Sequence, residues 1–247
     1  MIARRRKATA FAPAAILVLF VSSLAAEAQA LSVLPVNIFL QPGQSATTLT
    51  VTNQGTTRTS VQIRAYAWSQ QDGDEQLTPS DAVVISPPIA SIAPGANQVV
   101  RIIVRPSGSG TGREATYRIL VDQIPPPAEP GIVHVVLRLS IPIFSEPLTR
   151  AVPNVQFHVE MNAGQIFLVA TNSGLRHDVV RDIELSTNDG RKLAAVPGAS
   201  PYILAGASRR WSIAAQSPLP LPSETLRLTG HSDSGAIEQQ VRVVSTP

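Results

Sequence analysis

The sequence contains no cysteine, which removes several classes of protein from consideration. Without cysteine there is no disulfide framework, no thiolate nucleophile and no zinc–thiolate site. The four histidines, His134, His158, His177 and His231, lack the spacing of metal ligands and are interpreted as solvated or hydrogen-bonded side chains. No Gly-x-Ser-x-Gly elbow and no glycine-rich loop before a helix occurs. We therefore expect no metal, no cofactor and no enzymatic activity.

Long apolar runs are also absent, apart from one at the amino terminus. Four basic residues at positions 4–7 precede an apolar stretch over residues 8–26, and the small-residue pattern Ala-Gln-Ala ends at Ala30. This order is typical of a secretory signal. Its apolar core, residues 14–24, is shorter than the roughly 20 residues that a spanning helix needs. We expect cleavage after Ala30, which leaves residues 1–30 outside the fold and the mature chain without a membrane span.

The chain has no excess of charge once the signal is removed. The signal carries four of the 20 Lys and Arg residues and one of the 17 Asp and Glu residues, which leaves 16 of each sign. No basic run remains, so nucleic acid and anionic lipid are not expected partners. An exported chain without disulfides must gain its stability from packed cores.

Helical periodicity is missing, whereas short apolar/polar alternation recurs between Gly, Pro, Asn and Ser residues. This pattern indicates an all-β fold. Seven strands are predicted in the first half, at residues 32–40, 45–53, 60–69, 82–86, 98–104, 115–123 and 131–144. Six follow in the second half, at residues 155–161, 166–171, 180–186, 208–214, 225–230 and 239–244. We predict two immunoglobulin-like β-sandwich domains, residues 31–146 and 147–247, with the boundary near Pro147.

Two local patterns complete the assignment of strands and turns. The acidic segment DGDE at residues 72–75 lacks the spacing of a calcium loop and is interpreted as a hairpin turn. Trp68 and Trp211 are interpreted as core residues of their sandwiches.

The predicted strand at residues 131–144 differs from the others. Every odd-numbered residue from Val133 to Ile143 is Val, Leu or Ile, and period-2 geometry places these side chains on one face. Pro142 cannot donate to a ladder and belongs at an edge or a strand end. Two interpretations remain open: a core strand with a polar back, or an edge strand that offers an apolar row and unpaired backbone groups to a partner.

The ordered motifs of the chain resemble a known family. Residues 117–125, YRILVDQIP, followed after a short loop by SIPIF at residues 140–144, look like the last two strands of the N-terminal domain of periplasmic chaperones of the chaperone-usher pilus pathway. Further matches in the same order are NQG at 53–55, VQIR at 61–64, SPPI at 86–89, IAPG at 92–95 and VRI at 100–102, with NSG at 172–174 and DSG at 233–235 beyond them. The YRxxVD and IPxF patterns and the short proline-rich loop resemble the archaic branch.

The resemblance implies a fold and a function. Family members arrange two immunoglobulin-like domains as a boomerang with a cleft and lend a strand to a pilus subunit whose own fold lacks one. Carried over by position, the donor residues are Val133, Val135, Leu137, Leu139 and Ile141. The expected partners are pilin-like subunits and an outer-membrane usher, and the expected location is the periplasm of a Gram-negative bacterium.

The resemblance also implies an anchor for the carboxylate at the end of the subunit. Many members use a basic pair, but the matching places here hold Val36 or Asn37 and Pro142. The archaic branch uses the arginine of the YRxxVD motif instead, so Arg118 is the candidate, because an arginine fork gives directional bonds to a carboxylate. The alternative is that Arg118 forms a surface or interdomain ion pair.

A second set of residues, Arg101, Glu114 and Asp233, falls where the family places an interdomain ionic cluster. The resemblance implies that these charges fix the angle between the domains, although such a cluster is weak evidence of stability. The alternative is three unrelated exposed charges.

Three classes of function are therefore compared. A non-enzymatic assembly chaperone is favoured. A generic exported immunoglobulin-like adhesin or structural module would not need a one-sided apolar edge strand. A hydrolase would need a polar cluster that the sequence does not reveal. An unoccupied apolar edge is also a liability for self-association, so a dimer that hides the strand is a further hypothesis.

Overall fold

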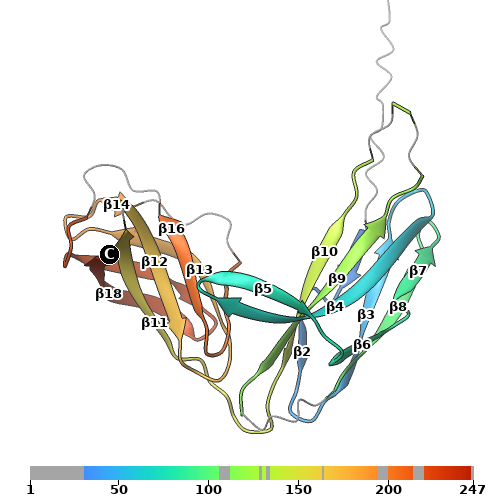
Figure 1. The fold of residues 1–247 in the computed structure, drawn as a ribbon, viewed down its shortest axis with the longest axis horizontal. Helices are drawn as coiled ribbons and strands as arrows, with labels where there is room; N and C mark the ends of the chain where they lie inside the picture. Colours follow the sequence, from blue (N-terminus) through green and yellow to red (C-terminus); the bar gives the residue numbers. More distant parts are fainter. Residues whose placement is uncertain are drawn as a thin grey trace, which may run out of the picture.

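The fold is known from a computed structural model that describes residues 31–105, 112–127, 130–131, 134–162, 164–193, 200–213 and 220–245. Within these ranges the chain forms β-strands and no helix, which confirms the all-β prediction. No helix that could cross a membrane occurs in this part of the chain. Two β-sandwiches meet at an angle, like the arms of a boomerang (Figure 1).

The N-terminal domain contains two packed sheets. Its strands are β1 (Leu31–Leu34), β2 (Ile38–Leu40), β3 (Ala46–Asn53), β4 (Thr59–Gln71), β5 (Asp74–Pro79), β6 (Val83–Ser86), β7 (Ile89–Ile92), β8 (Asn97–Val104), β9 (Ala115–Ile124) and β10 (Arg138–Ser145). One sheet has the order β1-β3-β8-β6, and the other has the order β2-β10-β9-β4-β5, with β7 also pairing with β4.

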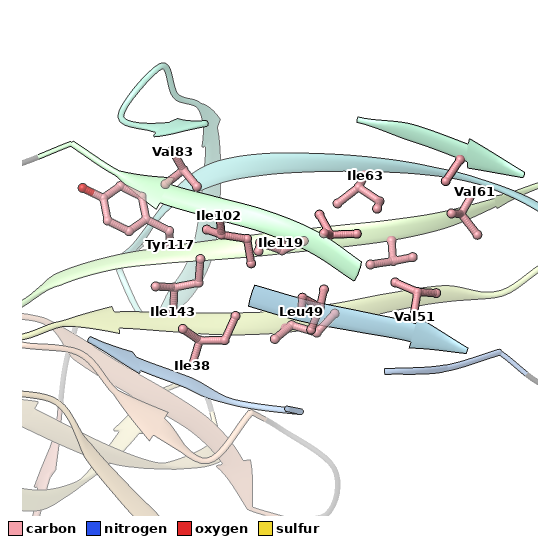
Figure 2. Close-up of a cluster of buried hydrophobic side chains, with 14 of the residues drawn as sticks. Ile38, Leu49, Val51, Val61, Ile63, Val83, Ile102, Tyr117, Ile119 and Ile143 are labelled. Atoms are coloured by element: carbon pink, nitrogen blue, oxygen red, sulfur yellow. The ribbon is translucent and has the colours of Figure 1, made fainter. Parts of the chain in front are cut away.

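Alternation along these strands produces the first core. Figure 2 shows Leu49 and Val51 of β3 and Ile102 of β8 facing Ile63 of β4 and Ile119 of β9 across the two sheets, and all five are at most 2% exposed. Complete burial of one such side chain stabilises the fold by about 1.5–3 kcal/mol. Inward-facing branched side chains from both sheets therefore hold the sandwich together without any disulfide.

The observed strands differ from the predicted ones in four places of this domain. The single strand predicted at residues 32–40 is divided into β1 and β2, which belong to different sheets. Strands β5 and β7 were not predicted; β5 is exposed throughout and therefore lacks an apolar alternation. The strand predicted at residues 131–144 is shorter in the structure, because its ladder begins at Arg138. Residues 132 and 133 lie outside the described residues.

The C-terminal domain has its own core. Its strands are β11 (Val155–Asn162), β12 (Gln165–Asn172), β13 (Asp178–Ser186), β14 (Lys192–Leu193), β15 (Tyr202–Ile203), β16 (Ser208–Ile213), β17 (Thr225–Ser232) and β18 (Gly235–Ser245). They pair in the order β14-β13-β17-β18-β11-β12-β16, and β15 pairs with β13. Trp211 belongs to this core, as predicted. The proposed boundary at Pro147 falls in the connection between β10 and β11.

A third apolar cluster joins the two domains. Trp68 of β4 and Phe144 of β10 pack with Leu204, which follows β15. Trp68 is 3% exposed, so its burial was predicted, but it lies between the domains instead of inside the first sandwich. The ring of Tyr202 meets Trp68 edge-on, with 5.4 Å between the ring centroids. The relative position of the domains therefore rests on aromatic packing.

The β4–β5 hairpin extends from the N-terminal domain onto the C-terminal domain (Figure 1). Its turn, Asp72-Gly73, has positive φ at both residues, which is the geometry of a two-residue type I′ turn and confirms the hairpin prediction. Gln70 donates a side-chain hydrogen bond to the carbonyl of Tyr202 at 2.8 Å, and its Oε1 accepts one from the amide of Leu204 at 2.9 Å. The hairpin therefore bridges the two domains.

Candidate subunit-binding edge and interdomain site

Strand β10 is an edge strand over most of its length. All eight of its residues pair with β9, whereas β2 pairs in parallel only with its last three, residues 143–145. Among the described residues, the stretch from Arg138 to Pro142 has no ladder partner on the side away from β9. The topology thus favours the edge interpretation of this strand.

The phase of the ladder shows which backbone groups of β10 face the open side. The amide of Gln123 donates to the carbonyl of Leu137 at 2.9 Å. Hydrogen-bonded pairs alternate in an antiparallel ladder, so the backbone groups of odd-numbered residues point to β9. Those of Arg138, Ser140 and Pro142 therefore point to the open edge. Because the backbone nitrogen of Pro142 points to the open edge, the missing N–H costs no hydrogen bond to β9. This agrees with the expectation that Pro142 lies at an edge.

The apolar row predicted on this strand emerges gradually from the core. Ile141 is 1% exposed and belongs to the first core, Leu139 and Leu137 pack partly buried against that core, and Val135 is 78% exposed. Val133 lies outside the described residues. The row is therefore buried at its carboxyl end and accessible toward its amino end.

The chain leaves the ladder at a defined point. Oε1 of Gln123 accepts a hydrogen bond from the amide of Leu137 at 3.2 Å, and its Nε2 donates to Oγ1 of Thr59 at 3.0 Å. A buried side-chain amide thus takes the place that a backbone carbonyl would have in a continuing ladder. This explains why residues 134–137 lie outside β10 although their alternation is that of a strand.

Asp122 fastens the first residue of β10 to β9. Its carboxylate accepts hydrogen bonds from Nη2 of Arg64, at 2.6 Å, and from Nε of Arg138. Desolvation alone would raise the pKa of Asp122, but the hydrogen bonds from Arg138 and Arg64 outweigh it and lower the pKa below its usual value. The carboxylate is therefore ionised at neutral pH and holds the start of the edge strand.

Arg118 lies in the region between the domains. Its guanidinium carbon is 3.7 Å from the ring centroid of Trp68 and 5.6 Å from that of Tyr202. Nη2 of Arg118 is 3.6 Å from Oε1 of Glu75, and the arginine side chain is 10% exposed. Burial lowers the pKa of Arg118, against the opposing effect of Glu75. The arginine predicted from the resemblance is thus a buried cation on an aromatic platform, with a carboxylate of its own chain as ion-pair partner.

Comparison with known proteins identifies the family that the N-terminal domain matches. Residues 30–150 match the family described as the pili and flagellar-assembly chaperone, PapD N-terminal domain. The N-terminal domain thus matches the PapD-like assembly chaperones. The Bordetella pertussis chaperone protein FimB/FhaD is 32% identical over 146 residues. That alignment covers 56% of each protein, so the chain spans about half the length of this curated relative.

Solved structures show that the PapD-like fold extends over both domains. A chain of the CsuC–CsuE chaperone–tip adhesion subunit complex of Acinetobacter baumannii matches with a TM-score of 0.65 and 20% identity, over 88% of this chain and 100% of that chain. A chain of the SafA pilin–SafB chaperone complex of Salmonella enterica matches with a TM-score of 0.58 and 15% identity, over 89% of this chain and 98% of that chain. The fold-class prediction is thereby confirmed.

The structure does not bring the three residues of the predicted ionic cluster together. Glu114 contacts His177, and Asp233 pairs with Arg181 of its own domain at 2.9 Å, where both side chains are about half exposed. Arg101 is an exposed residue in the middle of β8. The prediction of one cluster is therefore corrected, because each acid finds a nearer partner and the basic residue projects from a different sheet.

The PapD-like domain contacts its neighbour through a buried Glu–His pair that the sequence did not reveal. Oε2 of Glu114 lies 2.7 Å from Nδ1 of His177 and accepts a hydrogen bond from the backbone amide of the same residue at 3.0 Å. The imidazole stacks on Phe144 with 3.7 Å between centroids. Nearby, Arg176 of the second domain pairs with Glu146 at 3.4 Å. His177 was correctly interpreted as hydrogen-bonded, but no spacing in the sequence indicates its partner.

Among the described residues, no group of three or more His, Asp or Glu side chains is arranged to hold a metal ion. The two features suited to contact with another polypeptide are the open edge of β10 and the cationic region around Arg118. Both lie in strands of the same sheet, since Arg118 stands opposite Pro142 in the register of β9 and β10.

Proposed function

We propose that this protein is a periplasmic chaperone that binds pilus or fimbrial subunits by lending them strand β10, and that it delivers them to an outer-membrane usher. The observation that carries the proposal is the open edge of β10, where an apolar row emerges from the core beside unpaired backbone groups. The role is binding and release, without catalysis. The short-loop archaic branch is proposed from the YRxxVD motif.

An open strand edge protects a subunit by completing its unfinished sandwich. A sandwich that lacks one strand exposes an apolar groove between two unpaired edges and would aggregate. A donated strand supplies backbone hydrogen bonds through Arg138 and Ser140, while alternate apolar side chains enter the groove. The proposed donor residues are Val133, Val135, Leu137, Leu139 and Ile141. Ile141 also stabilises the chaperone itself, so the residues toward Val135 are the ones free to enter a subunit.

Arg118 is proposed as the anchor for the terminal carboxylate of the subunit. It lies opposite Pro142 of the donor strand, so a carboxylate bound there would fix the register of the subunit along β10. Its planar guanidinium, which lies over the ring of Trp68, can present two parallel N–H groups. The related structures of chaperones with a tip adhesion subunit and with a pilin support a subunit of this kind as the partner.

The test is co-expression in a Gram-negative periplasm with a pilin-like subunit, followed by pull-down. We compare the unmodified chain with Leu137→Asp, which puts a charge into the apolar row, and with Ser140→Asp, which puts the same charge on the exposed opposite face. We expect a soluble one-to-one complex with the unmodified chain and Ser140→Asp, and none with Leu137→Asp. Equal recovery of the subunit with both variants would contradict strand donation.

The anchor is tested in the same assay with Arg118→Ala, and Arg105→Ala serves as control because Arg105 is an exposed residue beyond the end of β8. We expect only Arg118→Ala to reduce capture. Unchanged capture by Arg118→Ala would remove the anchor while leaving strand donation standing. Melting curves of all four variants establish that each is folded.

A further inference from the structure

The tip of the β4–β5 hairpin lies on two buried arginines, one from each domain. Arg118 of β9 faces Glu75, two residues after the turn glycine. Arg209 of β16 donates from Nη1 to the carbonyl of Gly73 at 3.1 Å, and the two residues form an isolated parallel bridge. A segment of only three residues, 73–75, therefore contacts a cation of each domain.

The two arginines are not fully satisfied by the hairpin. Arg209 is 7% exposed, and its Nε is buried without a hydrogen-bond partner. Arg118 is 8% exposed, and its pairing with Glu75 at 3.6 Å is longer than a hydrogen bond. A buried cation is costly unless it is paired and hydrogen-bonded. Arg118 thus faces one carboxylate, Arg209 bonds a backbone carbonyl of the hairpin, and both arginines retain donors for an anion.

Contacts with the same three-residue segment of the hairpin place the two guanidinium groups in one region. Burial lowers the pKa of Arg118, Glu75 and Tyr202 raise it, and the positive charge of Arg209 lowers it further. Like charges close together in a region of low dielectric repel, and an anion bound between them relieves that repulsion. The region is therefore suited to a carboxylate that contacts both domains.

We infer that Arg118 and Arg209 together form the carboxylate site, and that Glu75 occupies it as an internal stand-in while no subunit is bound. The inference rests on the role proposed for Arg118. It adds Arg209 as a second cation of the site and Glu75 as a competitor of the bound carboxylate. The Glu75 side chain is 31% exposed, so rotation about its side-chain bonds can carry its carboxylate into solvent. The hairpin itself stays docked through Gln70.

A stand-in of this kind has a definite consequence for binding. A free carboxylate must displace Glu75 before it reaches the arginines, so its apparent affinity is its intrinsic affinity multiplied by the fraction of molecules in which the site is empty. When no subunit is bound, Glu75 supplies the negative charge that the two buried arginines would otherwise lack. Removing the charge of Glu75 should therefore increase the affinity for a free carboxylate. It should also slightly lower the free energy of unfolding of the protein without a bound carboxylate.

The experiment uses the full chain and sodium acetate as the probe, with sodium chloride at equal ionic strength as reference. The indole N–H signal of Trp68 in a nitrogen–proton NMR spectrum reports on the site, because Arg118 stacks on that ring. We compare the unmodified chain with Glu75→Gln and with Asp74→Asn. Asp74 is the exposed neighbouring residue of the hairpin, so its substitution makes the same change of charge one residue away.

We expect acetate to shift the Trp68 signal at a several-fold lower concentration in Glu75→Gln than in the unmodified chain and in Asp74→Asn. We expect Arg209→Gln to weaken the response and Arg118→Ala to abolish it. Identical titrations of Glu75→Gln, Asp74→Asn and the unmodified chain, with Arg118→Ala silent, would overturn the stand-in and leave the anchor intact. A full response in Arg118→Ala would instead remove the anchor on which the inference rests.

Discussion

The carboxylate of Glu114 and Nδ1 of His177 lie 2.7 Å apart, although the two residues belong to different domains. Their side chains are 0% and 2% exposed, and the second carboxylate oxygen has no hydrogen-bond partner. Water is excluded from this contact. The pair therefore helps to hold the two sandwiches together.

The first prediction concerns this joint. Glu114→Gln should lower the free energy of unfolding by about 1.5–3 kcal/mol, because a neutral amide replaces the carboxylate that accepts two hydrogen bonds from His177 in a buried site. Urea denaturation checks the value. Asp233→Asn is the control, since the exposed pair of Asp233 with Arg181 should contribute little. Equal effects of the two substitutions would show that the joint does not depend on Glu114.

A second prediction separates the two roles of the apolar row. Ile141→Ala should cost about 2–5 kcal/mol of stability, because Ile141 is buried in the first core. Val135→Ala should leave stability nearly unchanged, because Val135 is 78% exposed, but it should weaken subunit capture. Thermal melts and pull-downs of the two variants measure both quantities. Loss of stability in Val135→Ala would show that residues before β10 are part of the core.

Features of the fold that single residues determine were predicted from the sequence, whereas features that depend on contacts with other strands were not. The Asp72-Gly73 turn and the edge position of Pro142 follow from single residues, because positive φ and a missing N–H are properties of the chain itself. The length of the strand predicted at residues 131–144 was predicted less well. Alternation continues through Val135, but the ladder ends where Gln123 from another strand takes the amide of Leu137.

Contacts between the domains could not be predicted from the pattern. Trp68 was recognised as buried, yet no periodicity distinguishes a sandwich core from an interdomain cluster. Arg101, Glu114 and Asp233 were grouped by resemblance, and their actual partners depend on which loops meet at the joint. The resemblance located Arg118, but only the structure shows that it faces Glu75, in the hairpin that Arg209 also contacts.

A third prediction tests the docking of the hairpin. Gly73 has φ +88°, and a Cβ there would lie 2.7 Å from Cβ of Arg210. Gly43→Ala is a matched control, because Gly43 has a similar φ of +80° but nothing within 4 Å. Both substitutions carry the backbone penalty of about 1–2 kcal/mol, but only Gly73→Ala should also displace the hairpin from β16. Small-angle scattering and melting curves measure the difference; identical curves would contradict the docking.

A fourth prediction concerns acid. The pKa of Asp122 is lowered in the folded chain, because hydrogen bonds from Arg138 and Arg64 outweigh desolvation. The stabilising effect is therefore fully present above the unfolded pKa of about 3.9 and is lost as pH falls through the folded value. Asp122→Asn should be less stable than the unmodified chain at pH 7, by up to about 1 kcal/mol, and equally stable below the folded pKa. Denaturation at pH 7 and at a series of lower pH values tests this; a difference between the two chains that does not shrink as the pH falls below about 3.9 would refute the ionic origin.

The central claim is that β10 pairs with the bound polypeptide along its open edge. Amide hydrogen exchange at Arg138 and Ser140, with and without a captured subunit, measures this most directly, because both amides point away from β9. Strand donation predicts that both amides exchange at least tenfold more slowly in the complex, while the amide of exposed Val99 on the other sheet keeps its rate. Unchanged exchange at Arg138 and Ser140 in a stable complex would contradict the claim and place the subunit elsewhere.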